Sequence, residues 1–384
     1  MNTKDILTIN SIGGVGRKTL SEFINYVETK ISVFDLHHST IEGIFKELNV
    51  QNKKIKVPLK KDIDSAIEKT DLILTSSDKN QIHIVSIKDL RYPSQLRDIE
   101  DYPFLLYYKG NLECLSKPSA AVIGTRDPSS FGKQAGERIG YRLAEQNITV
   151  VSGLAKGCDT SGHIGCLKAN GKTVAVLAHG LDTVYPAENR GLAAKILEND
   201  GCLVSEYAIN TKVLSSYFIA RDRIQAGLSK AVIVIETDIK GGTMHTVNYS
   251  ITYNRYLAAV NHPSPYENDK SRGNKMLILE KNAQALNTKD DIDILIEKIN
   301  PSIKRTLFPT NIPINEIYIP LFEGIDFNPT IKKKSGKKPR YKKSKPNTTQ
   351  LPIDKDIIPL KTKKTRKKKE EIDTEKPDNN EPNI

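Results

Sequence analysis

A glycine- and threonine-rich stretch, KGGTMHT at residues 240–246, follows the apolar run AVIVIE at 231–236 after three intervening residues. Glycines leave backbone amides open to a ligand and threonine hydroxyls add donors, so the pattern predicts a phosphate-binding loop after a buried strand. Lys240 adds a positive charge to the same loop. The phosphate could belong to a free nucleotide that the protein cleaves, or to a nucleic-acid backbone that it holds.

Asp159 and His163 form a second candidate, because they lie four residues apart where GCDTSGHIGCL begins a helix. Side chains at this spacing share one helix face and could support acid–base chemistry or bind a metal. An aspartate that helps cap the helix and a histidine satisfied in the core are more common, and we expect them here. His179, Asp182 and Glu206 carry the same ambiguity. We therefore predict neither a catalytic residue nor a metal site.

Short apolar, β-branched runs alternate with helix-length segments from Ser119 onward. The runs are SAAVIG (119–124), ITVVSG (148–153), KTVAVLA (172–178), GCLVSE (201–206), KAVIVIE (230–236) and RYLAAV (255–260). Helical stretches such as GKQAGERIGYRLAEQ (132–146) and NRGLAAKILEND (189–200) separate them. Such alternation indicates an α/β, Rossmann-like domain whose mostly parallel sheet is covered on both faces. Ligands of such sheets bind at the carboxyl ends of the strands.

The loops at those strand ends concentrate small and polar residues. They read GTRDPSSFG (124–132), SGLAKGCDTSGH (152–163), HGLDTVYP (179–186) and TDIKGGTMHT (237–246). Arg126, in the first loop, can bind a phosphate through two hydrogen bonds. No loop matches GxGxxG or GxxxxGK[ST], so a dinucleotide or Walker-type nucleotide site is unsupported and no cofactor is predicted.

Amphipathic segments with few long strands predict a small helical domain over residues 1–85. Within it, the GGVG turn at 13–16 is followed by Arg17 and Lys18. This turn could belong to a helix–hairpin–helix element whose amides and cations contact DNA phosphates. It could equally be an ordinary glycine-rich turn between packed helices.

The rest of the chain divides into three predicted parts. They are a Rossmann-like domain at 86–300 that opens with a lead-in hairpin or strand at 86–118, an extended connector at 301–331, and a disordered lysine-rich tail at 332–384. The tail holds 18 Lys+Arg and 8 Asp+Glu, a net +10 of the total +12. Its few large apolar residues cannot offset the entropy lost on ordering. It could be a solubilising tail, but we expect a salt-sensitive arm for phosphate backbones.

The chain has 384 residues, no run of about 18 apolar residues, and no signal-peptide pattern in its start, MNTKDILTIN. A cytoplasmic protein without membrane association is therefore expected. Its four cysteines show no CxxC pair and no zinc-type spacing. They indicate buried thiols in a reducing compartment rather than a disulfide framework.

Seven short motifs stand out along the chain, and their order matters as well as their residues. They are YPSQLRDIEDYPFLLYYKGN (92–111), VIGTRDPSSFG (122–132), VVSGLAKGCDTSGH (150–163), TVAVLAHGLDTVYPAENRGL (173–192), LVSEY (203–207), YFIARDRIQAGLSKAVIVIE (217–236) and KGGTMHT (240–246). Together they resemble the DNA-processing protein A family (DprA, also called Smf) over roughly residues 90–290. The resemblance implies an extended Rossmann fold that binds and protects single-stranded DNA and loads a RecA-type recombinase in natural transformation or recombination. It also implies a homodimer formed around residues 250–300.

The resemblance also implies roles for individual residues. Arg126 matches the arginine of the family's G[ST]R loop. In the FPxRNR segment, Arg221 and Arg223 match the two arginines, and Phe218 matches the phenylalanine, a plausible stacking ring. The SGLA loop and the SG[ST] turn would donate backbone amides to the strand. The residues implied as DNA contacts are Arg126, Ser152, Gly153, Phe218, Arg221, Arg223, Lys240, Gly241, Gly242 and Thr243.

Two departures from the FPxRNR segment stand beside these matches, since Ile219 replaces proline and Asp222 replaces asparagine. A carboxylate so near a phosphate path would repel it unless Asp222 pairs with Arg221 or Arg223, or points into the fold. We therefore expect an affinity for DNA below the family norm. No winged-helix-like pattern follows the Rossmann-like domain.

An enzymatic alternative is a LOG-like nucleotide-binding or nucleotide-hydrolysing Rossmann protein, which carries PGGxGTxxE after a corresponding strand. Aligning KGGTMHTVN with that pattern places Asn248 where the catalytic glutamate would stand. A nucleotide-sensing module without chemistry is a third possibility. Because the carboxylate is missing, we predict a DNA-binding protein that is not an enzyme.

Overall fold

The computed structural model describes residues 1–32 and 34–302; the predicted connector and lysine-rich tail lie outside the described residues, apart from the first two residues of the connector. Four helices open the chain, as the sequence predicts for its N-terminal region. They are α1 (Thr3–Ser11), α2 (Arg17–Lys30), α3 (His38–Gln51) and α4 (Lys60–Lys79). Their apolar faces meet around fully buried Phe23 and Phe45, whose ring centroids are 5.1 Å apart.

The GGVG turn joins α1 to α2, and Gly14 takes a φ of +84°, which glycine adopts without strain. Arg17 donates to the backbone carbonyls of Tyr102 and, at 2.8 Å, Glu100. Its guanidinium also lies 4.8 and 5.0 Å from the ring centroids of Tyr102 and Phe104. These contacts occupy Arg17 within the fold, which favours the packed-turn alternative over a DNA-contacting helix–hairpin–helix.

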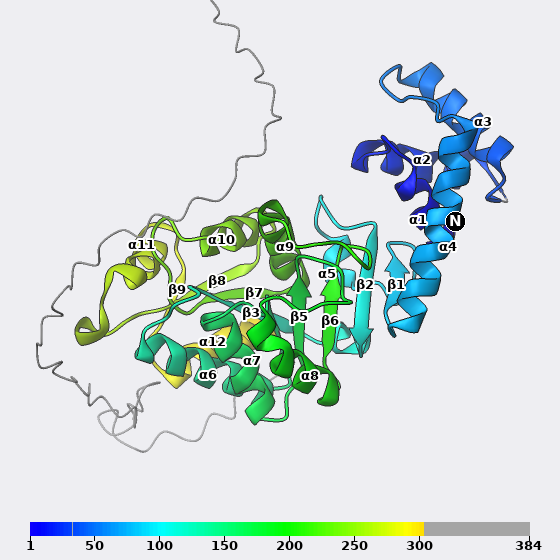
Figure 1. The fold of residues 1–384 in the computed structure, drawn as a ribbon. Helices are drawn as coiled ribbons and strands as arrows, with labels where there is room; N and C mark the ends of the chain where they lie inside the picture. Colours follow the sequence, from blue (N-terminus) through cyan, green and yellow to red (C-terminus); the bar gives the residue numbers. More distant parts are fainter. Residues whose placement is uncertain (33, 303–384) are drawn as a thin grey trace, which may run out of the picture. The chain divides into compact units, whose positions relative to one another are not determined.

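Within the described residues, nine strands form one mostly parallel sheet in the order β1-β2-β6-β5-β4-β3-β7-β8-β9 (Figure 1). The antiparallel members are β1 (His83–Ser86) and β2 (Leu105–Gly110). The parallel members are β3 (Ser119–Ile123), β4 (Thr149–Ser152), β5 (Thr173–Leu177), β6 (Cys202–Ser205), β7 (Ala231–Val234), β8 (Tyr256–Val260) and β9 (Gln284–Leu286). The α/β, Rossmann-like prediction is confirmed, and β1 extends across the predicted boundary between residues 85 and 86.

Helices cover both faces of the sheet, which explains why its central strands are buried throughout and mostly apolar (Figure 1). On one face lie α6 (Ser130–Glu145), α7 (Cys158–Lys168), α8 (Arg190–Glu198) and α12 (Lys289–Ile299). On the other lie α5 (Ser94–Arg97), α9 (Ser215–Leu228), α10 (Thr243–Thr252) and α11 (Arg272–Glu280). Short 3₁₀ turns occur at Leu112–Ser116, Ala187–Asn189, Ser264–Tyr266 and Asp269–Ser271.

The strand order reverses beside β3. The chain passes from β3 through β4, β5 and β6 on one side and then crosses to β7 on the other side. The loops that follow β3 and β7 therefore start from neighbouring strand ends and run to opposite sides. Open α/β sheets bind ligands in the space between such loops. The amide of Thr125 donates to the carbonyl of Glu236 at 2.7 Å, which ties the two loops together at their bases.

Candidate nucleic-acid interface

A hollow of about 480 Å³ lies at this reversal point. Loops after β3 and β7, the first turns of α7 and α10, and one face of α9 supply its walls. Its lining residues are Ile123, Gly124, Thr125, Arg126, Ala155, Asp159, Phe218, Ile219, Arg221, Asp222, Gln225, Asp238, Gly241, Gly242, Thr243, His245, Thr246 and Lys270. The hollow thus brings together six of the ten predicted contact residues: Arg126, Phe218, Arg221, Gly241, Gly242 and Thr243.

The half-buried ring of Phe218 lies beside two arginines. The guanidinium carbons of Arg126 and Arg221 are 5.3 and 5.9 Å from its ring centroid, within the range of a cation–π contact. Arg221 is buried and donates to the carbonyl of Val176 at 2.7 Å. Among the described residues, no hydrogen bond or ion pair engages the guanidinium of Arg126. Arg126 is therefore the arginine of this pair that is open to an incoming anion.

Asp222 pairs with Arg221, which is one of the two arrangements that would keep its carboxylate from repelling a phosphate. Its carboxylate lies 3.2 Å from the Nε atom of Arg221, and its side chain is only 13% exposed. The amide of Gln225, in the orientation that satisfies both groups, donates to the same carboxylate at 3.0 Å. Burial raises the pKa of Asp222, against the opposing effect of Arg221. The substitution therefore places a negative charge in the wall of the hollow, but one that is largely compensated.

The glycine turn stands at the start of α10. Gly242 is the N-cap residue of this helix, has no side-chain cap, and would meet no atom within 4 Å if it carried a Cβ. First-turn amides have no partner inside a helix, and the positive end of the helix dipole favours an anion there. The loop can thus present amide donors to a phosphate. Lys240 is exposed in the same loop but does not line the hollow.

Ser152 and Gly153 are placed differently from the expectation, because neither lines the hollow. The hydroxyl of Ser152 donates to the carbonyl of Val122 at 2.6 Å in the core. The amide of Gly153 donates to the buried carboxylate of Asp159 at 3.0 Å, so it is not free for a DNA strand. A Cβ at Gly153 would lie 1.8 Å from the guanidinium of Arg221. Glycine is needed here to leave room for the arginine, not to approach a ligand.

Arg223 also differs from the expectation. It is not part of the lining of the hollow, and its side chain is only 11% exposed. The guanidinium lies 2.5 Å from Glu206 and 3.7 Å from Asp101. Two carboxylates from distant segments therefore neutralise its charge, and this also gives Glu206 a structural role.

Asp159 and His163 have structural contacts, as the sequence favoured, but Asp159 bonds to loop amides instead of capping its helix, whose N-cap residue Gly157 has no side-chain cap. Asp159 accepts from the amides of Gly153 and Ala155, and burial raises its pKa to about 6. The Nδ1 atom of His163 lies 2.7 Å from the hydroxyl of Thr173, and burial lowers the pKa of this histidine to about 3. Both side chains are therefore buried, Asp159 in the wall of the hollow and His163 in the core, and the described residues contain no group of three or more His, Cys, Asp or Glu that could hold a metal.

Three residues near the hollow escaped the sequence analysis. The ring of Tyr185 is 47% exposed and lies 5.8 Å from that of Phe218, which extends the aromatic surface. His245 and Lys270 line the wall, and Lys270 forms an ion pair with Asp127. Tyr185 stands in the HGLDTVYP loop, so its position at a strand end was visible. Its contact with a ring 33 residues later was not.

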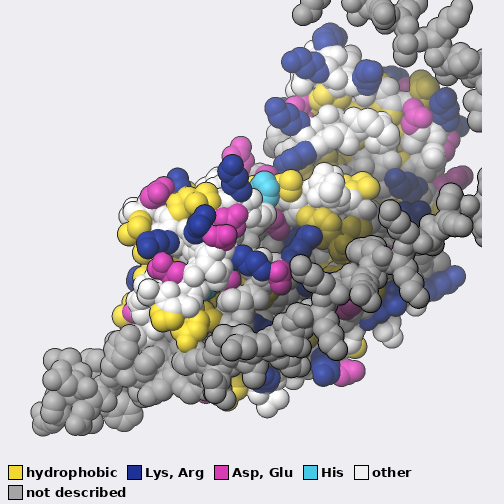
Figure 2. Space-filling model, turned by 60° about the vertical axis from the view of Figure 1, so that its left-hand side comes forward, with side chains coloured by type: hydrophobic (Ala, Val, Ile, Leu, Met, Phe, Trp, Pro, Cys, Tyr) yellow, Lys and Arg dark blue, Asp and Glu magenta, His cyan; other side chains and the backbone are white. Residues whose placement is uncertain are grey.

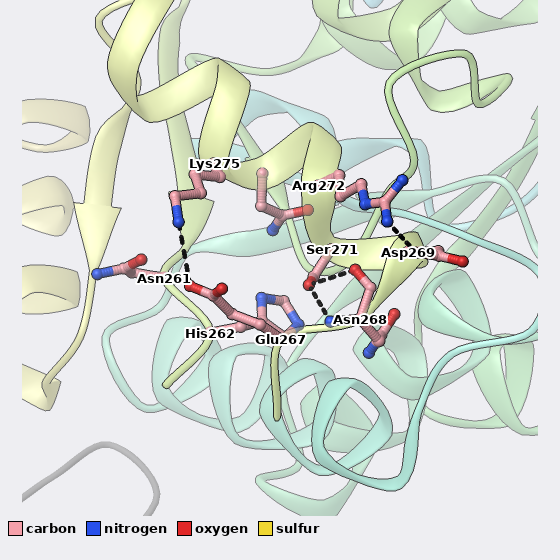
Figure 3. A pocket seen from close by; sticks show the side chains of 9 residues that line it. Asn261, His262, Glu267, Asn268, Asp269, Ser271, Arg272 and Lys275 are labelled. Atoms are coloured by element: carbon pink, nitrogen blue, oxygen red, sulfur yellow. Dashed lines mark hydrogen bonds and ion pairs between the residues drawn. The ribbon is translucent and has the colours of Figure 1, made fainter. Parts of the chain in front are cut away.

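A second, smaller hollow of about 270 Å³ lies between the end of β8 and α11 (Figure 3). Its charged side chains pair with one another, with Lys275 at 3.5 Å from Glu267 and Arg272 at 2.6 Å from Asp269. Mutual neutralisation leaves little attraction for a charged ligand. The hollow beside β3 is therefore the stronger candidate for a phosphate-bearing ligand.

Comparisons with known proteins agree with this geometry. A family model described as DNA recombination-mediator protein A matches residues 83–297. DNA processing protein DprA of Bacillus subtilis is 32% identical over 235 residues, which cover 61% of this chain and 78% of that protein. Protein Smf of Escherichia coli is 37% identical over 196 residues, 51% of this chain, so the match spans about half (52%) of the length of that relative.

Two solved structures share the fold. The X-ray structure of DprA from Streptococcus pneumoniae matches with a TM-score of 0.64 and 29% identity, over 77% of this chain and 98% of that one. DNA processing protein A from Helicobacter pylori, described with a unique single-stranded DNA binding mode, matches with a TM-score of 0.51 and 26% identity over 58% and 98%. None of the helices described for this chain has the length and apolar character needed to span a membrane. The chain belongs to the DNA recombination-mediator protein A family, as its motifs predicted.

Proposed function

We propose that this protein binds single-stranded DNA in the hollow beside β3, holding the strand by its phosphates and stacking a base on Phe218. The observation that carries the proposal is the unpaired guanidinium of Arg126 over the Phe218 ring, opposite the uncapped start of α10. An arginine, helix amides and an aromatic face are the three elements that single-strand binding combines.

The strand would be recognised through groups that every nucleotide shares. Arg126 and the amides at Gly242 and Thr243 meet phosphate oxygens, while Phe218, extended by Tyr185, meets the π-face of a base. On the face shown in Figure 2, basic and acidic side chains are interspersed. That face offers no broad basic surface, so the local geometry of the hollow is the source of affinity that we propose. Weak sequence preference and strong salt dependence follow.

We infer no bond cleavage at this site. Of the three carboxylates in the wall, Asp159 is held by two backbone amides, Asp222 by Arg221, and Asp238 accepts from the amide of Ile239 at 2.7 Å, so each is already engaged within the protein. Asn248, which stands where LOG-like proteins carry glutamate, lies on α10. The LOG-like nucleotide hydrolase therefore has less support than a binding protein, although a mononucleotide could still occupy the hollow.

The role in the cell that we propose is protection of single-stranded DNA and loading of a RecA-type recombinase during DNA uptake or recombination. Membership of the recombination-mediator family supports this role. We also propose a homodimer formed by residues 250–300. The exposed apolar residues Ile251, Tyr256 and Leu279, which are 49%, 48% and 71% exposed, support that surface.

Base stacking on Phe218 can be tested with an oligonucleotide and its abasic counterpart. We expect Phe218→Ala to weaken binding of the normal oligonucleotide by about 1–3 kcal/mol, roughly fivefold to more than a hundredfold. The abasic oligonucleotide should lose much less, because it has no base to stack. Phe218→Tyr, which keeps an aromatic face, is the control. Equal losses for both oligonucleotides would contradict the stacking role and show that the ring only supports Arg126.

A further inference from the structure

The loop between α3 and α4 carries a concentrated positive charge. Residues 48–61 contain five lysines and no acidic residue. These lysines, which we term the lysine cluster, are Lys53, Lys54, Lys56, Lys60 and Lys61. All five are exposed, and no ion pair among the described residues involves them. Lys4 and Lys46, in contrast, pair with Asp71 and Glu42 at 2.8 and 2.6 Å.

Buried and hydrogen-bonded residues hold this loop in place. Ile55 is only 3% exposed, and its amide donates to the carbonyl of Asn52 at 2.9 Å. The side-chain amide of Asn49 donates to the carbonyl of Ile55 at 2.6 Å. At the other end, Asp62 accepts from the amide of Leu59 at 3.2 Å. The loop therefore displays the lysines from an ordered backbone, which lowers the entropic cost of binding a partner.

The position of the cluster is unfavourable for the isolated protein. Lys60 and Lys61 occupy the first turn of the 20-residue helix α4, where positive charge opposes the helix dipole. Five like charges within nine residues also repel one another, and Asp62, beside Lys61 in the same first turn, offsets only part of this charge. An anionic partner removes both penalties at once. A partner with regularly spaced charges matches five lysines better than a single small anion does.

We propose that the lysine cluster is a second DNA-binding surface, which contacts the phosphate backbone of the strand whose other segment occupies the hollow beside β3. This inference rests on the proposed single-strand function, since that function supplies the polyanion. It assigns the N-terminal helices a role in holding longer DNA. Contacts of this kind are electrostatic and independent of sequence.

The test replaces all five lysines of the cluster with glutamine in the full chain. Binding to a labelled oligonucleotide of about 60 nucleotides is measured at several salt concentrations, and a short one of about 6 nucleotides serves for comparison. Each phosphate contact contributes about 0.7 to the slope of log affinity against log salt for single strands, so the slope should fall by up to about 3.5 for the long oligonucleotide. Affinity for the short oligonucleotide should not change.

Two controls separate the cluster from overall charge and from misfolding. Replacing five other exposed lysines with glutamine, Lys117, Lys195, Lys230, Lys281 and Lys289, removes the same net charge and should change the slope far less. Replacing the cluster with arginine should retain the slope. Urea unfolding of each variant checks that the fold is intact.

The outcomes distinguish this inference from the function on which it rests. If the natural chain binds neither oligonucleotide, the proposed single-strand function itself is wrong. If it binds both, and the cluster variant has an unchanged salt slope, or the scattered variant loses as much, the second surface is wrong. Loss of binding to anionic lipid vesicles with unchanged DNA binding would also overturn it and assign the cluster to a membrane surface.

Discussion

Arg126 and Arg221 illustrate how two residues of one type, beside one aromatic ring, take different tasks. Arg221 donates to the carbonyl of Val176, pairs with Asp222 and occupies the space beside Gly153, so its guanidinium already has partners within the wall of the hollow. Arg126 has no such partner among the described residues. In this account Arg221 shapes the hollow and supports Phe218, while Arg126 meets the phosphate.

His163 provides a pH-dependent test of the core at the same scale. Its pKa is about 3 in the folded protein and near 6.5 in an unfolded chain. Below pH 6.5 the unfolded chain therefore takes up a proton that the folded protein refuses, and the stability that His163 contributes is lost as pH falls from 6.5 towards 3. The raised pKa of Asp159 has the opposite effect, since its contribution to stability increases as the pH falls from about 6 to 3.8.

We expect His163→Asn, which can keep the hydrogen bond to Thr173, to remove the histidine's part of this pH dependence. The free energy of unfolding of the natural chain minus that of the variant should fall with decreasing pH below 6.5, by at most about 1.4 kcal/mol per pH unit. Urea unfolding at several pH values measures this difference. A difference that is constant from pH 7 to pH 4 would contradict a buried, neutral His163.

At the scale of elements, the reversal of strand order beside β3 determines the site. The loops after β3 and β7 come from segments about 110 residues apart, and the parallel pairing of these strands brings them together. The first turn of α10 and one face of α9 complete the walls. None of these elements carries enough groups alone, so the hollow depends on the intact sheet.

Gly153→Ala tests how closely these elements pack. The added Cβ would lie 1.8 Å from the guanidinium of Arg221, so the arginine must shift within a packed wall. We expect a loss of about 1–3 kcal/mol in the free energy of unfolding, measured with urea. Gly191→Ala is the matched control, because no atom lies within 4 Å of its added Cβ in helix α8 and alanine favours helices. Equal stability of the two variants would refute the close contact.

The elements were more predictable from the sequence than their contacts. Apolar β-branched runs fixed every parallel strand from β3 to β8, because a strand buried on both faces needs apolar side chains throughout. A glycine in a loop indicates from the sequence that the backbone there can adopt unusual conformations, but it does not indicate which group the amide of that residue bonds to. Gly153 was therefore assigned to a ligand although it serves Asp159. The ion pairs of Arg223 were likewise not predictable, since Glu206 and Asp101 approach it only in three dimensions.

At the scale of the whole molecule, the proposed homodimer makes a separate prediction. Leu279 on α11 is 71% exposed, within the predicted dimer region. We expect Leu279→Glu to shift the protein from dimer to monomer in gel filtration with light scattering, because a charge would be buried in the interface. Leu90→Glu is the control, since Leu90 is 94% exposed outside that region. A dimer that survives Leu279→Glu would place the interface elsewhere.

Titration with labelled single-stranded and double-stranded oligonucleotides is the most direct test of single-strand binding in the hollow beside β3. The titration is made with the natural chain and Arg126→Ala, with and without excess mononucleotide. We expect preference for the single strand, no competition by mononucleotide, and a loss of affinity of roughly tenfold or more in Arg126→Ala for every sequence, the effect of one charge-assisted contact. Efficient competition by mononucleotide, or an Arg126→Ala variant that binds single strands as the natural chain does, would contradict it.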